Sequence, residues 1–245
     1  MGGTTASGLL KQREINVELT ISDPVDSTRE KFAALGAEVT VNNSEAIRNK
    51  DLVMVVVKPW LVEQVLKEIS PSLAESQTLV VIAAGVPSAK ILEWTSRTRT
   101  FLAIPNIAIA ELASMTFLVP IGASDAETAC VKGLFDALGT TLITDEQHLA
   151  AGTTLASCGI AYALRYIRAA SEGGVELGFK ANDAKHIVMQ TVEGAVRLLS
   201  ATGMHSEQVI DMVTTPGGVT IKGLNEMEHA GFTSAVIRGL KAGLK

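Results

Sequence analysis

The sequence has few cysteines, few aromatic residues and no excess of positive charge. Its two cysteines, Cys130 and Cys158, have no CxxC motif and no histidine at ligand spacing, so we expect neither a zinc site nor a disulfide framework. The four histidines are scattered among polar residues, which also argues against a metal centre. Lysine and arginine number 21 against 26 acidic residues, a net charge of -5, which argues against binding to nucleic acid or an anionic membrane.

Long apolar runs are also missing. Residues 52–57 and 79–84 are apolar over the length of a strand, whereas a membrane helix needs about 20 such residues. The sequence does not open with the charged, apolar and small-residue regions of a secretory signal, and we therefore expect a cytoplasmic protein. Hydrophobic residues make up 47% and charged residues 19% of the 245 positions, as in chains that fold throughout.

The first 145 residues alternate short β-branched runs with segments of helical periodicity. The expected strands cover residues 18–22, 38–41, 52–57, 79–83, 100–104, 116–119 and 140–143. The expected helices cover residues 28–35, 61–69 and 126–138. This order predicts a mostly parallel sheet with helices on both faces, and the two continuously apolar strands belong in its centre.

After Asp145 no further strand is expected. Helical periodicity runs through residues 147–172, 181–200, 206–213 and 218–245. Formal charge is -6 up to residue 150 and +1 beyond it, and a near-neutral helical segment rich in apolar residues favours packing against another subunit. We therefore predict an α/β Rossmann-type domain over residues 1–145 and an all-α dimerisation and substrate domain over residues 146–245.

Candidate cofactor residues begin at the start of the chain. Gly2 opens a segment that is similar to the last glycine of a GxGxxG motif and the helix after it, although an ordinary helix start is the alternative. Asp23 lies 21 residues beyond Gly2 and directly after an expected strand, where a carboxylate accepts hydrogen bonds from the adenosine ribose of NAD. A turn aspartate before Pro24 is the alternative interpretation.

Three further strands end in residues that suit a flat ligand with phosphates. Lys58 and Pro59 follow the third expected strand, Ala84 and Gly85 follow the fourth, and Asn106 follows the fifth. In a parallel sheet these positions share the carboxyl edge, where ligands bind. The alternative interpretation of Lys58 is a solvated lysine before a helix.

The most specific stretch is the turn that precedes the last helix. Pro216, Gly217 and Gly218 force a tight turn, and Val219 and Thr220 then begin a helix. The backbone N–H groups of Gly218 and Val219, together with the Thr220 hydroxyl, form a site for the carboxylate of a small acid. A capped helix start without a ligand is the alternative.

These residues resemble the C-terminal signature of the pyrroline-5-carboxylate reductase family, [ST]-P-G-G-x-T followed by leucine, glutamate and Gly-Phe. The matching positions are Thr215 to Thr220, Leu224, Glu228, Gly231 and Phe232. Further matches follow in the family's order at Val57 to Pro59, Ile82 to Val86, Pro105 and Asn106, and Gly159 with Ala161 and Tyr162. The resemblance covers the chain from residue 1 to the end.

The resemblance implies a Rossmann domain and a helical domain that interlocks with a second subunit, so that the dimer builds each active site. It implies reduction of pyrroline-5-carboxylate to L-proline, the last step of proline biosynthesis, with NADPH or NADH. Asn43, Lys58 and Ala84 would line the dinucleotide and Asn106 would lie near the nicotinamide. Val219 and Thr220 would hold the substrate carboxylate and ring nitrogen; reduction of a cyclic imine needs a hydride and this hydrogen bond, but no metal.

Three departures from the family pattern affect these expectations. Similar proteins have a strand and the first fingerprint glycines ahead of the position of Met1, so we expect about ten residues of the central strand and phosphate turn to be missing. Asp23 replaces a residue that tolerates a 2′-phosphate, so NADH is expected to compete with NADPH. Ile160 replaces a proline of the family's Ser-Gly-Ser-Gly-Pro-Ala-Tyr segment.

Two alternative functions remain open at this point. One is a related dehydrogenase that acts on a different imine or on a keto acid derivative. The other is a non-catalytic dimeric paralogue or sensor that binds a small carboxylate, and the missing glycine turn is the one sequence feature that supports it.

Overall fold

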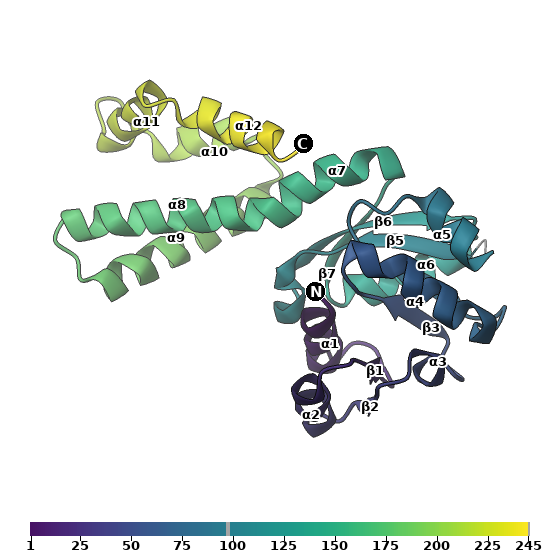
Figure 1. Ribbon diagram of the computed structural model, residues 1–245. Coiled ribbons are helices and arrows are strands. Elements are labelled where there is room, and N and C mark those ends of the chain that lie inside the picture. Colours follow the sequence, from purple (N-terminus) through teal and green to yellow (C-terminus); the bar gives the residue numbers. More distant parts are fainter. Residues whose placement is uncertain (97–98, 245) are drawn as a thin grey trace. The chain divides into compact units, whose positions relative to one another are not determined.

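The computed structural model describes residues 1–96 and 99–244. The chain divides into two compact units, residues 1–157 and residues 158–245 (Figure 1). The first unit contains every strand of the described chain, and the second is helical.

The strands of the first unit form two separate sheets. β1 (Thr20–Ser22) and β2 (Glu38–Thr40) make a parallel pair. The second sheet has the order β3 (Leu52–Val55), β4 (Thr78–Val81), β5 (Thr100–Ile104), β6 (Ser114–Ile121) and β7 (Gly139–Ile143). All its neighbours are parallel except β5 and β6, which are antiparallel. The seven predicted strands are thus confirmed, and the prediction of a mostly parallel sheet is confirmed with them.

The helices of the first unit are α1 (Gly2–Lys11), α2 (Asp26–Ala34), α3 (Asn43–Ala46), α4 (Val62–Ile69), α5 (Ser88–Thr95), α6 (Asp125–Asp136) and α7 (Leu149–Gly152). α1 and α6 pack on one face of the five-stranded sheet and α4 and α5 on the other, whereas α2 packs on β1 and β2. α3 and α5 were not expected from the sequence. α3 has four residues, too few for a helical period to be recognised, and its start is fixed by the Asn42 side chain, which accepts a hydrogen bond from the N–H of Glu45.

The core of the first unit has one layer on each side of the sheet. Val53 and Val55 of β3 pack with α4, in particular with the fully buried Leu66. On the opposite face Val80 and Phe101 pack with Leu9 of α1 and with Val131 and Phe135 of α6. Burial of each such side chain contributes about 1.5–3 kcal/mol. The continuously apolar β4 is buried on both faces, as its sequence predicts.

The second unit consists of α8 (Gly159–Glu176), α9 (Ala181–Thr202), α10 (Ser206–Val213), α11 (Val219–His229) and α12 (Phe232–Ala242). α8 and α9 approach closely, since a Cβ on Gly174 would lie 2.9 Å from the Cβ of Ala184. The expectation of one helix from residue 218 to the end is wrong, because Gly231 takes a φ of 82° between α11 and α12. The expected helical stretch 147–172 is confirmed from Leu149 onward, as α7, a π-helical segment (Thr153–Cys158) and α8 in succession.

No helix in residues 1–96 or 99–244 combines the length and the hydropathy that a membrane crossing demands.

Candidate active site

The predicted cofactor residues lie at the ends of consecutive strands of the first unit. Asp23 follows β1, Asn43 opens α3 after β2, Lys58 and Pro59 follow β3, Ala84 and Gly85 follow β4, and Asn106 follows β5. Because β1 and β2 are parallel, and β3, β4 and β5 are parallel, these residues mark the carboxyl edge of each sheet. The edge is the usual place for a ligand in an open α/β sheet.

The amino end of α1 contributes to the same edge. A Cβ on Gly2 would lie 3.4 Å from the carbonyl oxygen of Val56, just beyond β3. No side chain caps this helix, so its first N–H groups and the positive end of its dipole are available for an anion. Gly8 holds the helix in place, because a Cβ there would lie 2.4 Å from the carbonyl oxygen of Ile109. The glycines, the open N–H groups and the dipole fit the phosphates of a dinucleotide.

Asp23 takes part in a turn before α2, and its role toward a ribose stays a prediction. Its Oδ1 accepts a hydrogen bond from the N–H of Val25 at 2.8 Å, as in a turn before a helix. Its Oδ2 has no hydrogen bond within the described residues and remains free for a ribose hydroxyl. Nη1 of Arg29 donates to the carbonyl oxygen of Asp23 at 2.6 Å, while Nη2 forms an ion pair with Asp26. The Arg29 guanidinium is therefore held between the Asp23 backbone carbonyl and the Asp26 carboxylate.

The loops after β3 and β4 present different surfaces. Nζ of Lys58 lies 5.9 Å from the ring centre of the exposed Trp60, and Pro59 starts the short 3-10 helix Pro59–Leu61 that contains Trp60. Ala84 and Gly85 are exposed, and Gly85 has a φ of 77°, which favours glycine. A flat group can thus approach the 84–85 backbone without meeting a large side chain.

The two asparagines are less free than the sequence suggested. Asn106 is buried; its Oδ1 accepts from the N–H of Ala108 at 3.0 Å and its Nδ2 donates to the carbonyl oxygen of Ala156 at 3.3 Å. Nδ2 of Asn43 donates to Glu68 at 3.1 Å. The Asn106 amide therefore fixes the local backbone, and it is not a free polar group at the edge.

The predicted substrate residues form one turn in the second unit. The N–H of Gly218 donates to the carbonyl oxygen of Thr215 at 2.9 Å, and Gly217 has a φ of 71°, as at the third position of a type II turn. No side chain caps α11, and Val219 and Thr220 are exposed in its first turn. Gly217, Gly218, Val219 and Thr220 therefore lie together around open N–H groups that suit a carboxylate.

Two residues near these sites were missed from the sequence. Glu146 accepts a hydrogen bond from the N–H of Ser88 at 2.9 Å and another from its hydroxyl, which fixes the amino end of α5 next to the 84–87 loop. Ser88 and Glu146 are 58 positions apart, so no local sequence pattern could pair them. Oγ1 of Thr215 packs against Gly218, because a Cβ added to Gly218 would lie 2.5 Å from this oxygen. The position of Thr215 in the family signature was the sequence feature that could have indicated this role.

Neither site offers a metal centre. Within residues 1–96 and 99–244, no group of three or more histidine, cysteine, aspartate or glutamate side chains is placed to hold a metal ion.

Two family models match the chain. The model described as pyrroline-5-carboxylate reductase dimerisation matches residues 146–245. The model described as NADP oxidoreductase, coenzyme F420-dependent, matches residues 1–85.

Several solved structures share the fold. A pyrroline-5-carboxylate reductase of Streptococcus pyogenes is 29% identical with a TM-score of 0.86, covering 98% of this chain and 93% of that one. A Plasmodium falciparum pyrroline carboxylate reductase, solved with NADP bound, is 24% identical with a TM-score of 0.87, covering 100% of this chain and 92% of that one. The second likeness shows the fold alone.

Curated relatives agree with these matches. Pyrroline-5-carboxylate reductase 1 of Dictyostelium discoideum is 35% identical over 98% of this chain, which spans 46% of that longer protein. Pyrroline-5-carboxylate reductase of Arabidopsis thaliana is 34% identical over 99% of this chain and 87% of the relative. The chain belongs to the pyrroline-5-carboxylate reductase family.

Proposed function

We propose that this chain reduces pyrroline-5-carboxylate to L-proline with NADH or NADPH, as the final step of proline biosynthesis in the cytoplasm. The observation that carries the proposal is the uncapped start of α11 behind the Thr215 to Gly218 turn, in a chain that belongs to this family. A bound nicotinamide supplies the hydride. The chain's own residues position the imine and hold its charged groups.

The α11 start is suited to both polar groups of the substrate. The open N–H groups of its first turn and the helix dipole hold the carboxylate. The Thr220 hydroxyl lies in the same turn and donates a hydrogen bond to the ring nitrogen. The imine is protonated in solution, so catalysis needs alignment more than a strong acid.

The cofactor site uses groups from the edge described above. The amino end of α1 at Gly2 takes the phosphates, and Oδ2 of Asp23 accepts a hydrogen bond from the ribose. Asp23 repels a 2′-phosphate and favours NADH, whereas Arg29 attracts it, so the chain accepts both cofactors. Asn43, Lys58, Pro59, Ala84 and Gly85 complete this proposed set, and the buried Asn106 amide holds the backbone after β5 in place.

Dimerisation is part of the proposal and rests on the second unit. Within residues 158–244 Ala184 is the one buried residue, while Leu164 of α8 is 57% exposed and Val196 of α9 is 61% exposed. Exposed apolar side chains on this scale mark an interface. We place a second copy of the chain on the helices of residues 146–245, to which the dimerisation model corresponds.

The proposal is tested by incubating the purified chain with pyrroline-5-carboxylate and either cofactor. We expect loss of the reduced-nicotinamide absorbance and formation of proline, detected by mass spectrometry. Pyrroline without its carboxylate is the matched control, and it should react far more slowly. Binding of the cofactor without turnover would reject the enzyme in favour of a sensor, and equal rates on both imines would reject the carboxylate site.

A further inference from the structure

Glu146 caps α5 from a distant segment of the chain. Its Oε1 accepts a hydrogen bond from the N–H of Ser88 at 2.9 Å, and its Oε2 accepts one from the Ser88 hydroxyl. Pro87, the residue before the helix, provides no side-chain cap, so Glu146 satisfies an N–H group that the helix itself leaves open. A carboxylate at this position also interacts favourably with the positive end of the helix dipole. Glu146 therefore fixes where α5 begins.

Glu146 is itself held on both sides. Oδ1 of Asp145 accepts a hydrogen bond from the N–H of His148 at 3.0 Å and lies 2.7 Å from Nδ1 of its ring, and this cap starts the short 3-10 helix that contains Glu146. Leu149 follows directly and packs against the core cluster that contains Val86. The carboxylate therefore projects from a fixed piece of backbone and not from a free loop.

The segment ahead of α5 has little support of its own. It follows β4, and residues 84–86 make no backbone–backbone hydrogen bond within the described chain. Ala84 and Gly85 are exposed, whereas Val86 is buried in the core. The path of this backbone is thus set by the end of β4 on one side and by Ser88 on the other.

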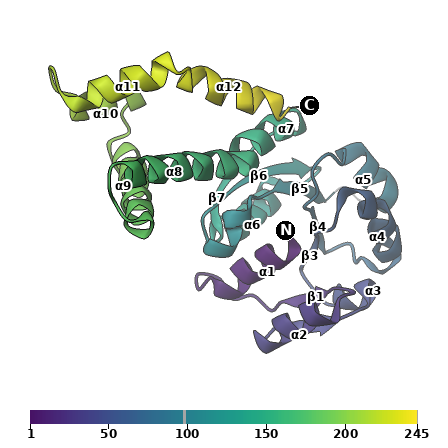
Figure 2. The ribbon, with the colours of Figure 1, turned by 60° about the vertical axis from the view of Figure 1, so that its left-hand side comes forward.

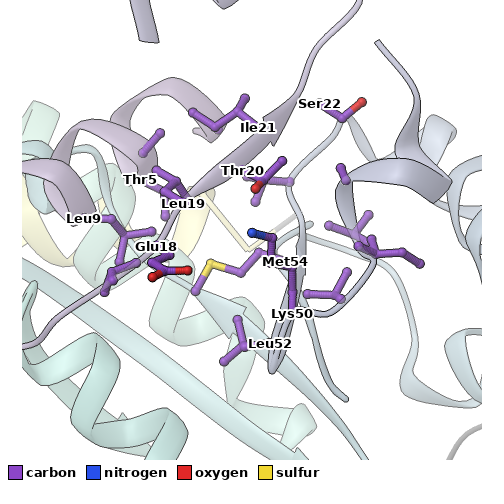
Figure 3. Close-up of a pocket in the computed structure, with 18 of the residues that line it drawn as sticks. Thr5, Leu9, Glu18, Leu19, Thr20, Ile21, Ser22, Lys50, Leu52 and Met54 are labelled. Atoms are coloured by element: carbon purple, nitrogen blue, oxygen red, sulfur yellow. The ribbon is translucent and has the colours of Figure 1, made fainter. Parts of the chain in front are cut away.

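The cavity between β1 and β3 does not position this segment. It has a volume of about 960 Å³, and Leu52 and Met54 line it from the β3 side (Figure 3). Residues 84–88 do not contribute to its wall. The position of the segment is therefore decided at its own two ends.

We propose that Glu146 is a positioning residue for the nicotinamide cofactor. Through Ser88 it holds the backbone of Ala84 and Gly85 where a flat ring can approach, and it acts through this link and not by contact with the ligand. A segment that is held in advance loses less conformational freedom when the ligand binds, which increases the affinity. The inference rests on the proposed function, because it takes the 84–85 backbone as part of the cofactor site.

Loss of the Glu146 carboxylate should leave α5 folded. Ile91 is fully buried, and Thr95 is buried and donates its hydroxyl to the Ile91 carbonyl oxygen at 2.8 Å. α5 also packs beside α4 on one face of the five-stranded sheet (Figures 1 and 2). The helix is thus anchored by its buried face, and a substitution at Glu146 affects the position of its first turn.

Glu146→Ala tests the proposal through cofactor binding and kinetics. We expect the Kd for NADH to rise roughly tenfold and the KM for NADH to rise with it, while kcat changes less than about threefold, because binding lost equally in the ground state and the transition state raises KM alone. The KM for pyrroline-5-carboxylate at saturating NADH should stay the same, since the turn before α11 is untouched.

Two further variants separate the link from a general loss of charge. Glu146→Gln keeps an acceptor oxygen for the Ser88 N–H and should recover most of the affinity for NADH. Glu93→Ala is the matched control, because it removes a carboxylate from an exposed ion pair with Lys90 on the same helix. Its Kd for NADH should equal that of the parent chain.

Hydrogen exchange supplies a measurement that needs no ligand. In the free chain, amide exchange of residues 84–90 should be roughly tenfold faster in Glu146→Ala than in the parent, while exchange of residues 53–55 should not change. Ser88→Ala removes the hydroxyl bond and keeps the N–H bond, so its effect should be smaller. The double variant should not exceed Glu146→Ala, because both changes act on one link.

The outcomes separate the positioning role from the proposed function. A parent chain that bound neither NADH nor NADPH would reject the proposed function, and this inference with it. A parent chain that bound them, with the same Kd in Glu146→Ala as in Glu93→Ala, would overturn the positioning role and leave the function intact. Faster exchange in Glu146→Ala without a change in Kd would also overturn it, because the link would then hold the segment without serving the cofactor.

Discussion

The N–H of Gly218 donates a hydrogen bond to the carbonyl oxygen of Thr215 at 2.9 Å, and this bond closes the turn that starts α11. Gly217 completes the turn with a φ of 71°, a conformation that other residues adopt with strain. The position of the open N–H groups of α11 therefore depends on two adjacent glycines with different tasks. Gly217 allows the backbone path, and Gly218 leaves room for Oγ1 of Thr215.

Gly217→Ala tests this dependence. The added Cβ strains the left-handed backbone by roughly 1–2 kcal/mol, so the turn shifts and the KM for pyrroline-5-carboxylate should rise several-fold, with a smaller change in kcat. Gly223→Ala in the middle of α11 is the control, since its Cβ would meet open space and should stabilise the helix slightly. An unchanged KM in Gly217→Ala would separate the turn from substrate binding.

Thr220→Ala should lower kcat/KM on pyrroline-5-carboxylate by roughly ten- to a hundredfold. The change removes one positioning hydrogen bond at the ring nitrogen and leaves the Rossmann unit untouched. Cofactor affinity, measured by fluorescence titration, should stay the same. Thr220→Ser keeps the hydroxyl and should recover most of the rate; if Thr220→Ala turned over normally, Thr220 would have no part in the reaction.

The central strands could be predicted from the sequence because each is apolar over several consecutive residues. The segment that contains Leu79 and Val81 could hardly be anything but a central strand, and β4 is buried on both faces. The carboxyl-edge residues followed from this, since the strand order places Lys58 and Gly85 on one edge. The turn before α11 could also be predicted, because Pro216 at its second position and Gly217 at its third position favour a type II turn.

Features that depend on distant contacts could not be predicted. The bond from Ser88 to Glu146 joins segments 58 residues apart, and no local rule signals it. The Asn106 amide was expected at the nicotinamide, but folding uses it to bind the backbone at Ala108 and Ala156. Arg29 reaches the Asp23 carbonyl across one helical turn, a contact that depends on a rotamer and not on spacing.

Stability at acidic pH should depend on Glu38. Hydrogen bonds from Thr20 and Lys50, and the charge of Lys50, hold the pKa of the Glu38 carboxyl below its usual range. A lowered pKa in the folded state adds stability that is complete above the unfolded pKa of about 4.3 and is lost as the pH falls through the folded value. Glu38→Gln should therefore melt slightly below the parent chain at neutral pH.

The difference between these two melting temperatures should shrink as the pH falls through the lowered pKa of Glu38, below which both chains carry a neutral group. The effect is small, because the Glu38 side chain is 75% exposed. Glu14→Gln, at an exposed carboxylate without an ion pair in the described chain, is the control and should show no such trend. A difference that stayed constant with pH would place the effect in packing and not in charge.

Asp23→Ser should move cofactor preference toward NADPH. The substitution removes a negative charge beside the ribose, which would otherwise repel a 2′-phosphate, while a serine hydroxyl can still accept the hydrogen bond from Val25. We expect the ratio of kcat/KM for NADPH to that for NADH to rise roughly tenfold, which corresponds to about 1.4 kcal/mol. Glu30→Ser removes the same charge from an exposed position on α2 and should leave the ratio unchanged. If Asp23→Ser changed the ratio no more than Glu30→Ser, Asp23 would serve the turn before α2 and the selection of the cofactor would lie elsewhere.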